Sequence, residues 1–166
     1  SLYAGIMIDT NNFLTKTGVR TFEAAAFLRR CGADVTRVRK MFREHVEDYR
    51  AKGEAIRNAE LFREHFAISV CPSEGLDSPT VVGAQAANEL LNIIGVKASF
   101  VLTDYRNTIY ISARSIDEIN VQIVMERLGG GGHLNIAGAQ LEHYSITEAK
   151  DVLKQTLQKM LDEGDI

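Results

Sequence analysis

The chain has 166 residues, of which 45% are hydrophobic, and its net charge is −3 from 19 basic and 22 acidic side chains. This apolar fraction is typical of a globular protein and excludes a disordered one. The charge is uneven, since residues 1–66 carry 12 basic and 9 acidic side chains while residues 67–166 carry 7 and 13. This balance excludes a strongly basic protein that coats nucleic acid along its whole length, but it permits a local phosphate site.

The two cysteines, Cys31 and Cys71, are too few and too far apart for a disulfide framework or a thiolate metal site. No apolar run reaches the ~18 residues of a membrane span. An apolar segment over residues 3–9 opens the chain and predicts a buried strand. Because domains rarely begin inside a strand, we expect the sequence to be part of a longer protein.

Two helices are predicted after this strand. Thr21 is placed to cap a helix over residues 22–31, and Gly32 can end it. Asp34 is placed to cap a second helix, whose apolar residues follow helical spacing. The first part of the chain is therefore predicted to hold one strand and two helices.

A polar and charged stretch over residues 44–63 predicts a long exposed helix that bridges two units. Beyond it strands and helices alternate, which indicates an α/β class with a mixed sheet flanked by helices. The predicted elements of this second unit are a strand over 66–71, a helix over 79–94, strands over 96–103 and 108–114, a helix over about 119–128, a strand over 138–144 and a final helix from Ser145.

Capping patterns mark two of these helices. Ser145 and Glu148 form a capping box at the start of the last helix. The start of the helix before it has two candidates, because Ser115 with Glu118 fits a capping box and Asn120 is also a good cap. Helical spacing predicts that the last helix buries an apolar stripe, which consists of Ala149, Leu153, Leu157 and Met160.

Four consecutive glycines precede His133 and form the strongest local feature of the sequence. One glycine would be enough to end a helix, so Gly129–Gly132 require a further reason. Without Cβ atoms their amides can approach a ligand closely and form an anion-binding concavity, to which His133 adds a donor. The alternative is a flexible loop with an incidental histidine. No Gly-Lys-Ser/Thr follows, so a nucleoside triphosphatase loop is disfavoured.

The strand over residues 108–114 places Tyr110, Ser112 and Arg114 on one face. A hydroxyl and a guanidinium at the end of one strand face suit a phosphate, because arginine binds phosphate in a bidentate fork. Tyr110 would add a stacking surface. The alternative is an ordinary solvated strand face.

Asp9 ends the predicted strand over 3–9, at the kind of position where ligands and metals bind in α/β proteins. One carboxylate is not a metal site, because divalent cations need several oxygen or imidazole ligands. The alternative role for Asp9 is to cap a helix or turn.

These features together resemble a known family. Gly129-Gly-Gly-Gly-His133, followed by Ala137-Gly138, is similar to the signature of the DHH-associated domain of the DHH phosphoesterase superfamily. Two longer stretches, one from Ser112 to Gln140 and one that includes Met7-Ile-Asp9-Thr-Asn-Asn-Phe13, resemble the membrane-anchored cyclic-di-AMP phosphodiesterases of the GdpP type. The resemblance covers essentially the whole chain.

The resemblance implies a truncated end of the DHH catalytic domain over residues 1–48, a bridging helix over 49–64 and a complete DHH-associated domain over 65–166. It also implies a reaction in which two Mn²⁺ ions, held by Asp and His side chains, activate a water against a phosphodiester. Asp9 matches the last metal-ligating Asp of that set. The Asp-His-His motif that supplies other ligands is absent and would precede residue 1, so this chain alone is expected to be inactive.

By the same resemblance, the wall that grips substrate phosphate across the interdomain cleft consists of Ser112, Arg114, Gly130, Gly131, Gly132 and His133. The implied partners are a cyclic dinucleotide or short oligonucleotide and the upstream DHH domain of the same polypeptide. We do not expect long nucleic acid as a partner, and a homodimer is a possible assembly. The resemblance places this chain in the cytoplasm, with its parent anchored in the membrane through an N-terminal region.

The implied function is hydrolysis of cyclic-di-AMP to a linear dinucleotide by the parent, with this chain supplying the phosphate and nucleotide grip. One alternative is an oligoribonuclease or nucleotide 3′-phosphate phosphatase of the same superfamily. The other is a non-catalytic nucleic-acid-binding module, because related domains serve as RNA-binding appendages of tRNA synthetases. The acidic balance of residues 67–166 argues against broad nucleic-acid binding, since such affinity scales with the number of neutralised phosphates.

Overall fold

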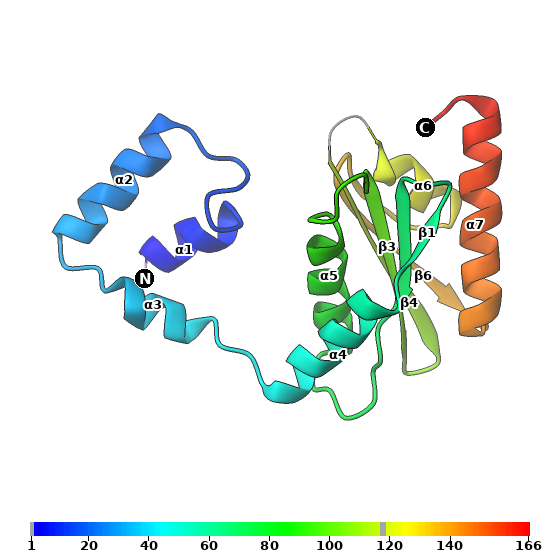
Figure 1. The fold of residues 1–166 in the computed structure, drawn as a ribbon, viewed down its shortest axis with the longest axis horizontal. Coiled ribbons are helices and arrows are strands. Elements are labelled where there is room, and N and C mark those ends of the chain that lie inside the picture. The colour runs from blue at the N-terminus through cyan, green and yellow to red at the C-terminus, as the bar shows by residue number, and fades with distance from the viewer. Residues whose placement is uncertain (1, 117–118) are drawn as a thin grey trace. The chain divides into compact units, whose positions relative to one another are not determined.

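The computed structural model describes residues 2–116 and 119–166 (Figure 1). The chain divides into two compact units, Ser1–Glu44 and His45–Ile166. The helix over residues 46–57 therefore groups with the second unit. Each unit has its own order of elements.

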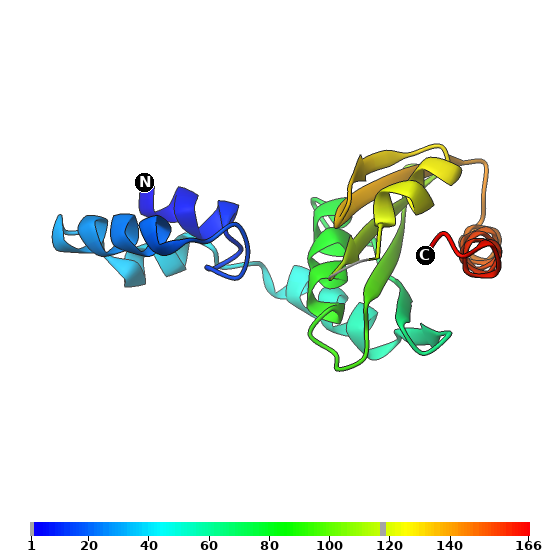
Figure 2. The ribbon, with the colours of Figure 1, turned by 90° about the horizontal axis from the view of Figure 1, so that it is seen from above.

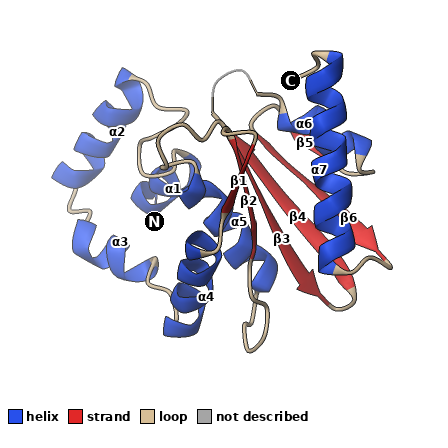
Figure 3. Cartoon of the chain, turned by 45° about the vertical axis from the view of Figure 1, so that its right-hand side comes forward, coloured by secondary structure: helices blue, strands red, loops and turns tan. Residues whose placement is uncertain are grey.

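In residues 2–44 of the first unit the regular elements are all helices, α1 (Leu2–Asp9), α2 (Val19–Arg30) and α3 (Val35–Met41), joined by turns (Figure 3). The strand predicted over residues 3–9 is wrong, because this segment is α1. A short apolar run fits a buried helix as well as a strand. A strand also needs a neighbour for its backbone hydrogen bonds, and residues 2–44 contain no other strand, whereas a helix pairs its own N–H and C=O groups.

The predicted cap is wrong for α2, whose N-cap is Gly18 and not Thr21, and confirmed for α3. α2 begins at Val19, three residues before the predicted start, because Thr21 acts from inside the helix as the partner of the Gly18 N-cap. The Gly18 amide donates to Thr21 Oγ1 at 3.3 Å. Asp34 caps α3 as predicted, since its Oδ1 accepts from the amides of Thr36 and Arg37 at 2.9 and 3.2 Å.

The second unit is built on a mixed sheet flanked by helices, which confirms the predicted α/β class. The strand order is β1-β2-β3-β4-β6-β5; β2 and β3 are parallel and the other neighbours are antiparallel. The strands are β1 (Glu60–Phe62), β2 (Phe66–Val70), β3 (Ala98–Tyr105), β4 (Thr108–Ser115), β5 (Gly131–His133) and β6 (Ile136–Glu142). The helices are α4 (Val46–Arg57), α5 (Pro79–Leu90), α6 (Val121–Arg127) and α7 (Ile146–Glu163).

The sheet has helices on both faces (Figure 2). On one face, α6 and α7 bury a core with the inward side chains of the strands, and the predicted stripe of α7 is fully buried in it. On the opposite face, α4 and α5 pack over β2 and β3 through small residues: Ala51, Ala55, Ala86 and Ala87. Toward β6 that second face stays open, because Ile136, Gln140 and Glu142 are exposed. The open part of this face carries the site described below.

Several boundaries differ from the prediction for local reasons. The helix predicted over 44–63 ends at Arg57, because Glu60–Phe62 pairs with β2. The helix predicted to run to residue 94 ends at Leu90. The last strand is Ile136–Glu142 instead of 138–144, because His143 takes a positive φ of 63° and leaves the strand.

The two candidate caps of α6 are resolved in favour of Asn120, whose side chain accepts from the amides of Gln122 and Ile123. Ser115 instead lies in β4, and its hydroxyl donates to the carbonyl of Ile119 at 2.7 Å. Glu118, its proposed capping partner, lies outside the described residues.

Candidate functional site

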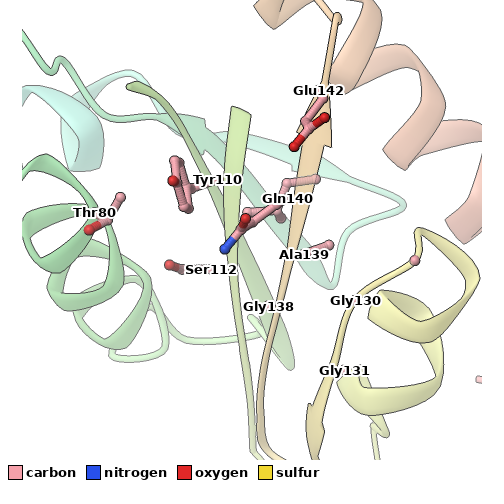
Figure 4. Close-up of a pocket in the computed structure, with 11 residues that line it drawn as sticks. Thr80, Tyr110, Ser112, Gly130, Gly131, Gly138, Ala139, Gln140 and Glu142 are labelled. Carbon is pink, nitrogen blue, oxygen red and sulfur yellow. The ribbon is translucent and has the colours of Figure 1, made fainter. Parts of the chain in front are cut away.

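A pocket of about 630 Å³ opens on the uncovered side of the sheet (Figure 4). Its size falls in the range of ligand-binding pockets. One lining residue comes from α5, and the rest come from β4, β6 and the glycine segment. The lining residues are Thr80, Tyr110, Ile111, Ser112, Gly129, Gly130, Gly131, Gly138, Ala139, Gln140 and Glu142.

The register of the strands determines which side chains meet on this face. Ser112 of β4 lies opposite Gly138 of β6, which in turn lies opposite Gly131 of β5. Opposed residues in a ladder point to the same side of the sheet, so this row presents one hydroxyl and two glycines. Because two of its three residues are glycines, the row has no side chain other than that of Ser112. The floor of the pocket is therefore largely backbone.

Not every glycine of the run serves the pocket. A Cβ on Gly130 would lie 2.6 Å from Ala139 Cα, and one on Gly132 would lie 2.5 Å from Ala137 Cα. Both positions require glycine because the backbone of β6 passes so close. A Cβ on Gly131 would meet nothing within 4 Å, so Gly131 lies against open space. Close approach to the neighbouring strand, not to a ligand, thus explains Gly130 and Gly132.

Arg114 lies one step farther along the same face of β4, opposite Ile136. Its Nε donates to Asn88 Oδ1 on α5 at 3.0 Å, and its Nη1 donates to the carbonyl of Ala113 at 2.9 Å. Partial burial lowers the pKa of the Arg114 guanidinium from its usual value, but arginine keeps its charge. A fixed, half-buried cation therefore stands beside the Ser112 row.

His133 is exposed on β5 and also lies opposite Ile136. Arg114, Ile136 and His133 thus form a second row on the same face, parallel to the row of Ser112, Gly138 and Gly131. At this end of the strands, the Arg114 guanidinium and the His133 imidazole both present hydrogen-bond donors on one face. Such an arrangement suits an anion such as a phosphate.

Comparison with known proteins assigns the chain to a family. A model of the DHHA1 domain matches residues 65–160. The chain belongs to the DHHA1 domain family. It is 41% identical over 165 residues to the cyclic-di-AMP phosphodiesterase GdpP of Geobacillus thermodenitrificans, covering 99% of this chain and 25% of that protein. It is 42% identical over 154 residues to the cyclic-di-AMP phosphodiesterase PdeA of Listeria monocytogenes, covering 92% of this chain and 23% of that protein.

The chain therefore spans about a quarter of the length of these curated relatives. Among solved structures, an exopolyphosphatase-related protein from Bacteroides fragilis matches with a TM-score of 0.83 and 23% identity, covering 93% of this chain and 48% of that one. This match bears on the fold.

Within the DHHA1 domain, the predicted site residues fall into three groups. Ser112, Gly130 and Gly131 line the pocket. Arg114 and His133 lie outside the lining but on the same face, in the neighbouring row. Gly132 lies opposite Ala137, in the register that alternates with these rows.

Asp9, the predicted metal ligand, belongs to the other unit. It is exposed at the C-terminal end of α1, so its expected place at the end of a strand is wrong. Within residues 2–116 and 119–166, no three His, Cys, Asp or Glu side chains gather into a group that could hold a metal ion. The described residues do not by themselves form a metal site.

Apart from Tyr110, which the sequence suggested as a stacking surface, the lining has three polar side chains that were not predicted as site residues: Thr80, Gln140 and Glu142. Gln140 and Glu142 alternate along β6 with the buried Ala139 and Leu141, so strand alternation places them on the face of Ser112. The predicted strand over 138–144 already held both residues in this alternation, but the sequence did not show that the strand pairs with β4 and so places them beside Ser112. Thr80 had no such signal, because its position depends on how α5 packs beside β4.

No helix in the described part of the chain is long and apolar enough to cross a membrane.

Proposed function

We propose that this chain is the substrate-gripping part of a phosphodiesterase that hydrolyses cyclic-di-AMP to a linear dinucleotide. The observation that carries the proposal is the shared face of Ser112, Gly131, Arg114 and His133, which combines a hydroxyl, an open glycine, a guanidinium and an imidazole beside one pocket. The 41% identity to GdpP over nearly the whole chain supports the choice of substrate.

In this proposal the residues of the chain bind and orient the phosphate. The Arg114 guanidinium forms charge-assisted hydrogen bonds to the phosphate oxygens, which are stronger than neutral ones. Its hydrogen bond to Asn88 fixes the direction of the fork before substrate arrives. Ser112 and His133 donate further hydrogen bonds, and Gly131 lets the substrate approach the backbone.

The proposal includes Mn²⁺ as a cofactor of the full-length protein, with Asp9 as one of several ligands. A metal pair supplies an activated water and neutralises developing charge when it is bound. Because the described residues form no metal cluster, the other ligands would come from the parts of the relatives' length that this chain does not span. The proposal also places the chain in the cytoplasm, in a parent anchored to the membrane.

The test is turnover of cyclic-di-AMP by the full-length protein, followed by chromatography of the linear product. We expect hydrolysis by the full-length protein with Mn²⁺ and none by residues 1–166 alone. A linear dinucleotide that is hydrolysed faster than the cyclic one would replace the proposal with an oligoribonuclease. Turnover of neither substrate would overturn it.

A further inference from the structure

The pocket has an electrostatic direction along the strands. Among the described lining residues, Glu142 is the one with a charged side chain, and it pairs with Thr108 at the far end of β4. Arg114 lies six residues along β4 from Thr108, which is about 20 Å for extended backbone. Glu142 repels a phosphate from the part of the pocket that it lines, where the nearby Arg106 stacks on Tyr105 and is not a lining residue, and Arg114 attracts a phosphate toward the opposite end. The neutral part of a nucleotide therefore points toward Glu142.

An aromatic surface lies at that end. Tyr110 lines the pocket, and its ring centroid lies 6.4 Å from that of Tyr105 at an interplanar angle of 49°. The Arg106 guanidinium lies 4.9 Å from the Tyr105 centroid and makes a cation–π contact with that ring. A partly exposed aromatic ring beside a pocket is a stacking surface for a nucleobase.

Two polar side chains lie beside this ring and differ in what they can bind. Gln140 is directly opposite Tyr110 in the ladder, and Figure 4 shows its amide extending toward Tyr110 and Ser112. An amide both donates and accepts, so Gln140 can bond to most base edges. Glu142 follows on the same face, and its carboxylate accepts only. It can bond to an amino group of a base but not to a carbonyl in the same place.

We propose that Tyr110, Gln140 and Glu142 form a base-reading subsite, in which Tyr110 stacks on the base and Glu142 selects a base that carries an exocyclic amino group. The phosphate of the same nucleotide lies at the Gly131 row, four residues or about 13 Å from Glu142 along the strand, and Arg114, farther along, binds the second phosphate of a dinucleotide. This assignment rests on the proposed function in that the site takes a nucleotide. It goes beyond it by assigning a role in selectivity to residues outside the glycine-histidine segment.

The test compares adenosine monophosphate with purine riboside monophosphate, which lacks the exocyclic amino group and, like adenosine, carries no hydrogen on N1. Binding of each to residues 1–166 is measured by isothermal titration calorimetry at one fixed salt concentration. We expect adenosine monophosphate to bind about 10-fold to 100-fold more tightly, since hydrogen bonds to charged groups are among the stronger ones. Equal affinity of the two nucleotides, or no saturable binding of adenosine monophosphate, would overturn the proposal.

Variants separate selectivity from folding. In Glu142→Gln a neutral amide replaces the carboxylate and binds the amino group more weakly, so the ratio of the two affinities should fall toward one. Glu74→Gln, an exposed change outside the pocket, should keep the ratio of the wild type. Tyr110→Ala should weaken both nucleotides alike, whereas Tyr110→Phe should not. A Glu142→Gln variant that keeps the wild-type ratio would contradict the proposal, provided that its thermal unfolding is unchanged.

The nucleotide-binding experiment and the hydrolysis experiment can fail independently of each other. If the full-length protein hydrolyses cyclic-di-AMP but the two mononucleotides bind equally, the base-reading subsite is wrong and the proposed function stands. If the amino group is selected but cyclic-di-AMP is not hydrolysed, the subsite stands and the substrate assignment is wrong.

Discussion

Gly130 is so close to β6 that a Cβ atom on it would lie 2.6 Å from the Cα of Ala139. The same atom would also collide with the carbonyl oxygen of Gly138. Backbone atoms cannot rotate out of the way as a flexible side chain can. Gly131, the next residue, has the opposite surroundings, since its Cβ would meet nothing within 4 Å. Both glycines line the pocket, but only at Gly130 does packing against β6 require the absence of a side chain.

A pair of alanine substitutions can separate packing from binding. Gly130→Ala should destabilise the protein by about 1–3 kcal/mol, because it overpacks a site bounded by backbone. Gly131→Ala should keep the stability of the wild type, but its methyl group should weaken nucleotide binding at the phosphate end of the pocket. Urea unfolding and calorimetric titration of adenosine monophosphate measure the two effects. Equal loss of stability in both variants would contradict the division.

Arg114 and His133 should contribute separately to phosphate binding. Arg114→Ala should weaken the binding of a linear adenosine dinucleotide with two phosphates about 10-fold to 100-fold, because it removes charge-assisted hydrogen bonds. Arg114→Lys should restore part of the affinity, since lysine keeps the charge but not the planar fork. His133→Ala should cost less, because His133 is exposed.

A matched control for these variants is Arg57→Ala, at the exposed end of α4. It removes the same charge at a position outside the pocket and should leave nucleotide affinity unchanged. If Arg114→Ala and His133→Ala both bind as tightly as Arg57→Ala, the two residues are not part of the phosphate grip.

Much of the second unit could be predicted from local chemistry. The Ser145–Glu148 capping box marks the start of α7, and the alternation from Thr108 to Arg114 gives the face of β4 on which the site lies. These features depend on neighbours within one element. For the same reason, sequence alternation correctly placed Ser112 and Arg114 on one side of a strand.

The errors arose where long-range pairing decides the structure. The apolar segment of α1 has no periodicity that separates a buried helix from a strand. The sequence predicts a loop at Gly131–His133, but this segment forms β5. The glycines of the run allow the backbone of β6 to lie close beside it, and the two segments pair as strands. No local pattern shows which strand will lie beside such a segment.

The buried thiol of Cys71 predicts a pH dependence of stability. Burial, together with the nearby Glu54 carboxylate, raises the pKa of Cys71 to about 11. The ordinary pKa of the thiol, taken for the unfolded chain, is 9.0. Stability is therefore unaffected below that value and falls as the pH rises toward 11, because the unfolded state ionises first. The loss should be about 2 kcal/mol by pH ~10.5.

Urea unfolding from pH ~7 to ~10.5 measures this loss. Cys71→Ala should lose less stability over this range than the wild type, because the ionising group is absent. Cys31→Ala removes an exposed cysteine and should behave as the wild type does. Identical pH slopes for the wild type and Cys71→Ala would rule out the raised pKa as the cause.

Salt dependence distinguishes a nucleotide pocket from a nucleic-acid-binding module. The phosphate end of the pocket offers two basic side chains, Arg114 and His133, on its face. The logarithm of the association constant for a dinucleotide should fall with the logarithm of the salt concentration with a slope of about −1. Long single strands should bind no more tightly. A steep slope with long strands would instead support the module.

Mn²⁺ should not bind to residues 1–166 with measurable affinity, because the described residues form no group of metal ligands. Adding or removing Mn²⁺ should therefore leave the thermal unfolding of this chain unchanged, since ligands stabilise only the state that they bind.

In the full-length protein, Asp9→Ala should abolish hydrolysis of cyclic-di-AMP, whereas Asp34→Ala, which removes a helix cap, should lower stability and leave metal-dependent turnover intact. Full activity of Asp9→Ala would exclude Asp9 from the metal site, and an Mn²⁺-dependent rise in the unfolding temperature of residues 1–166 would show that this chain holds a metal without the rest of the protein.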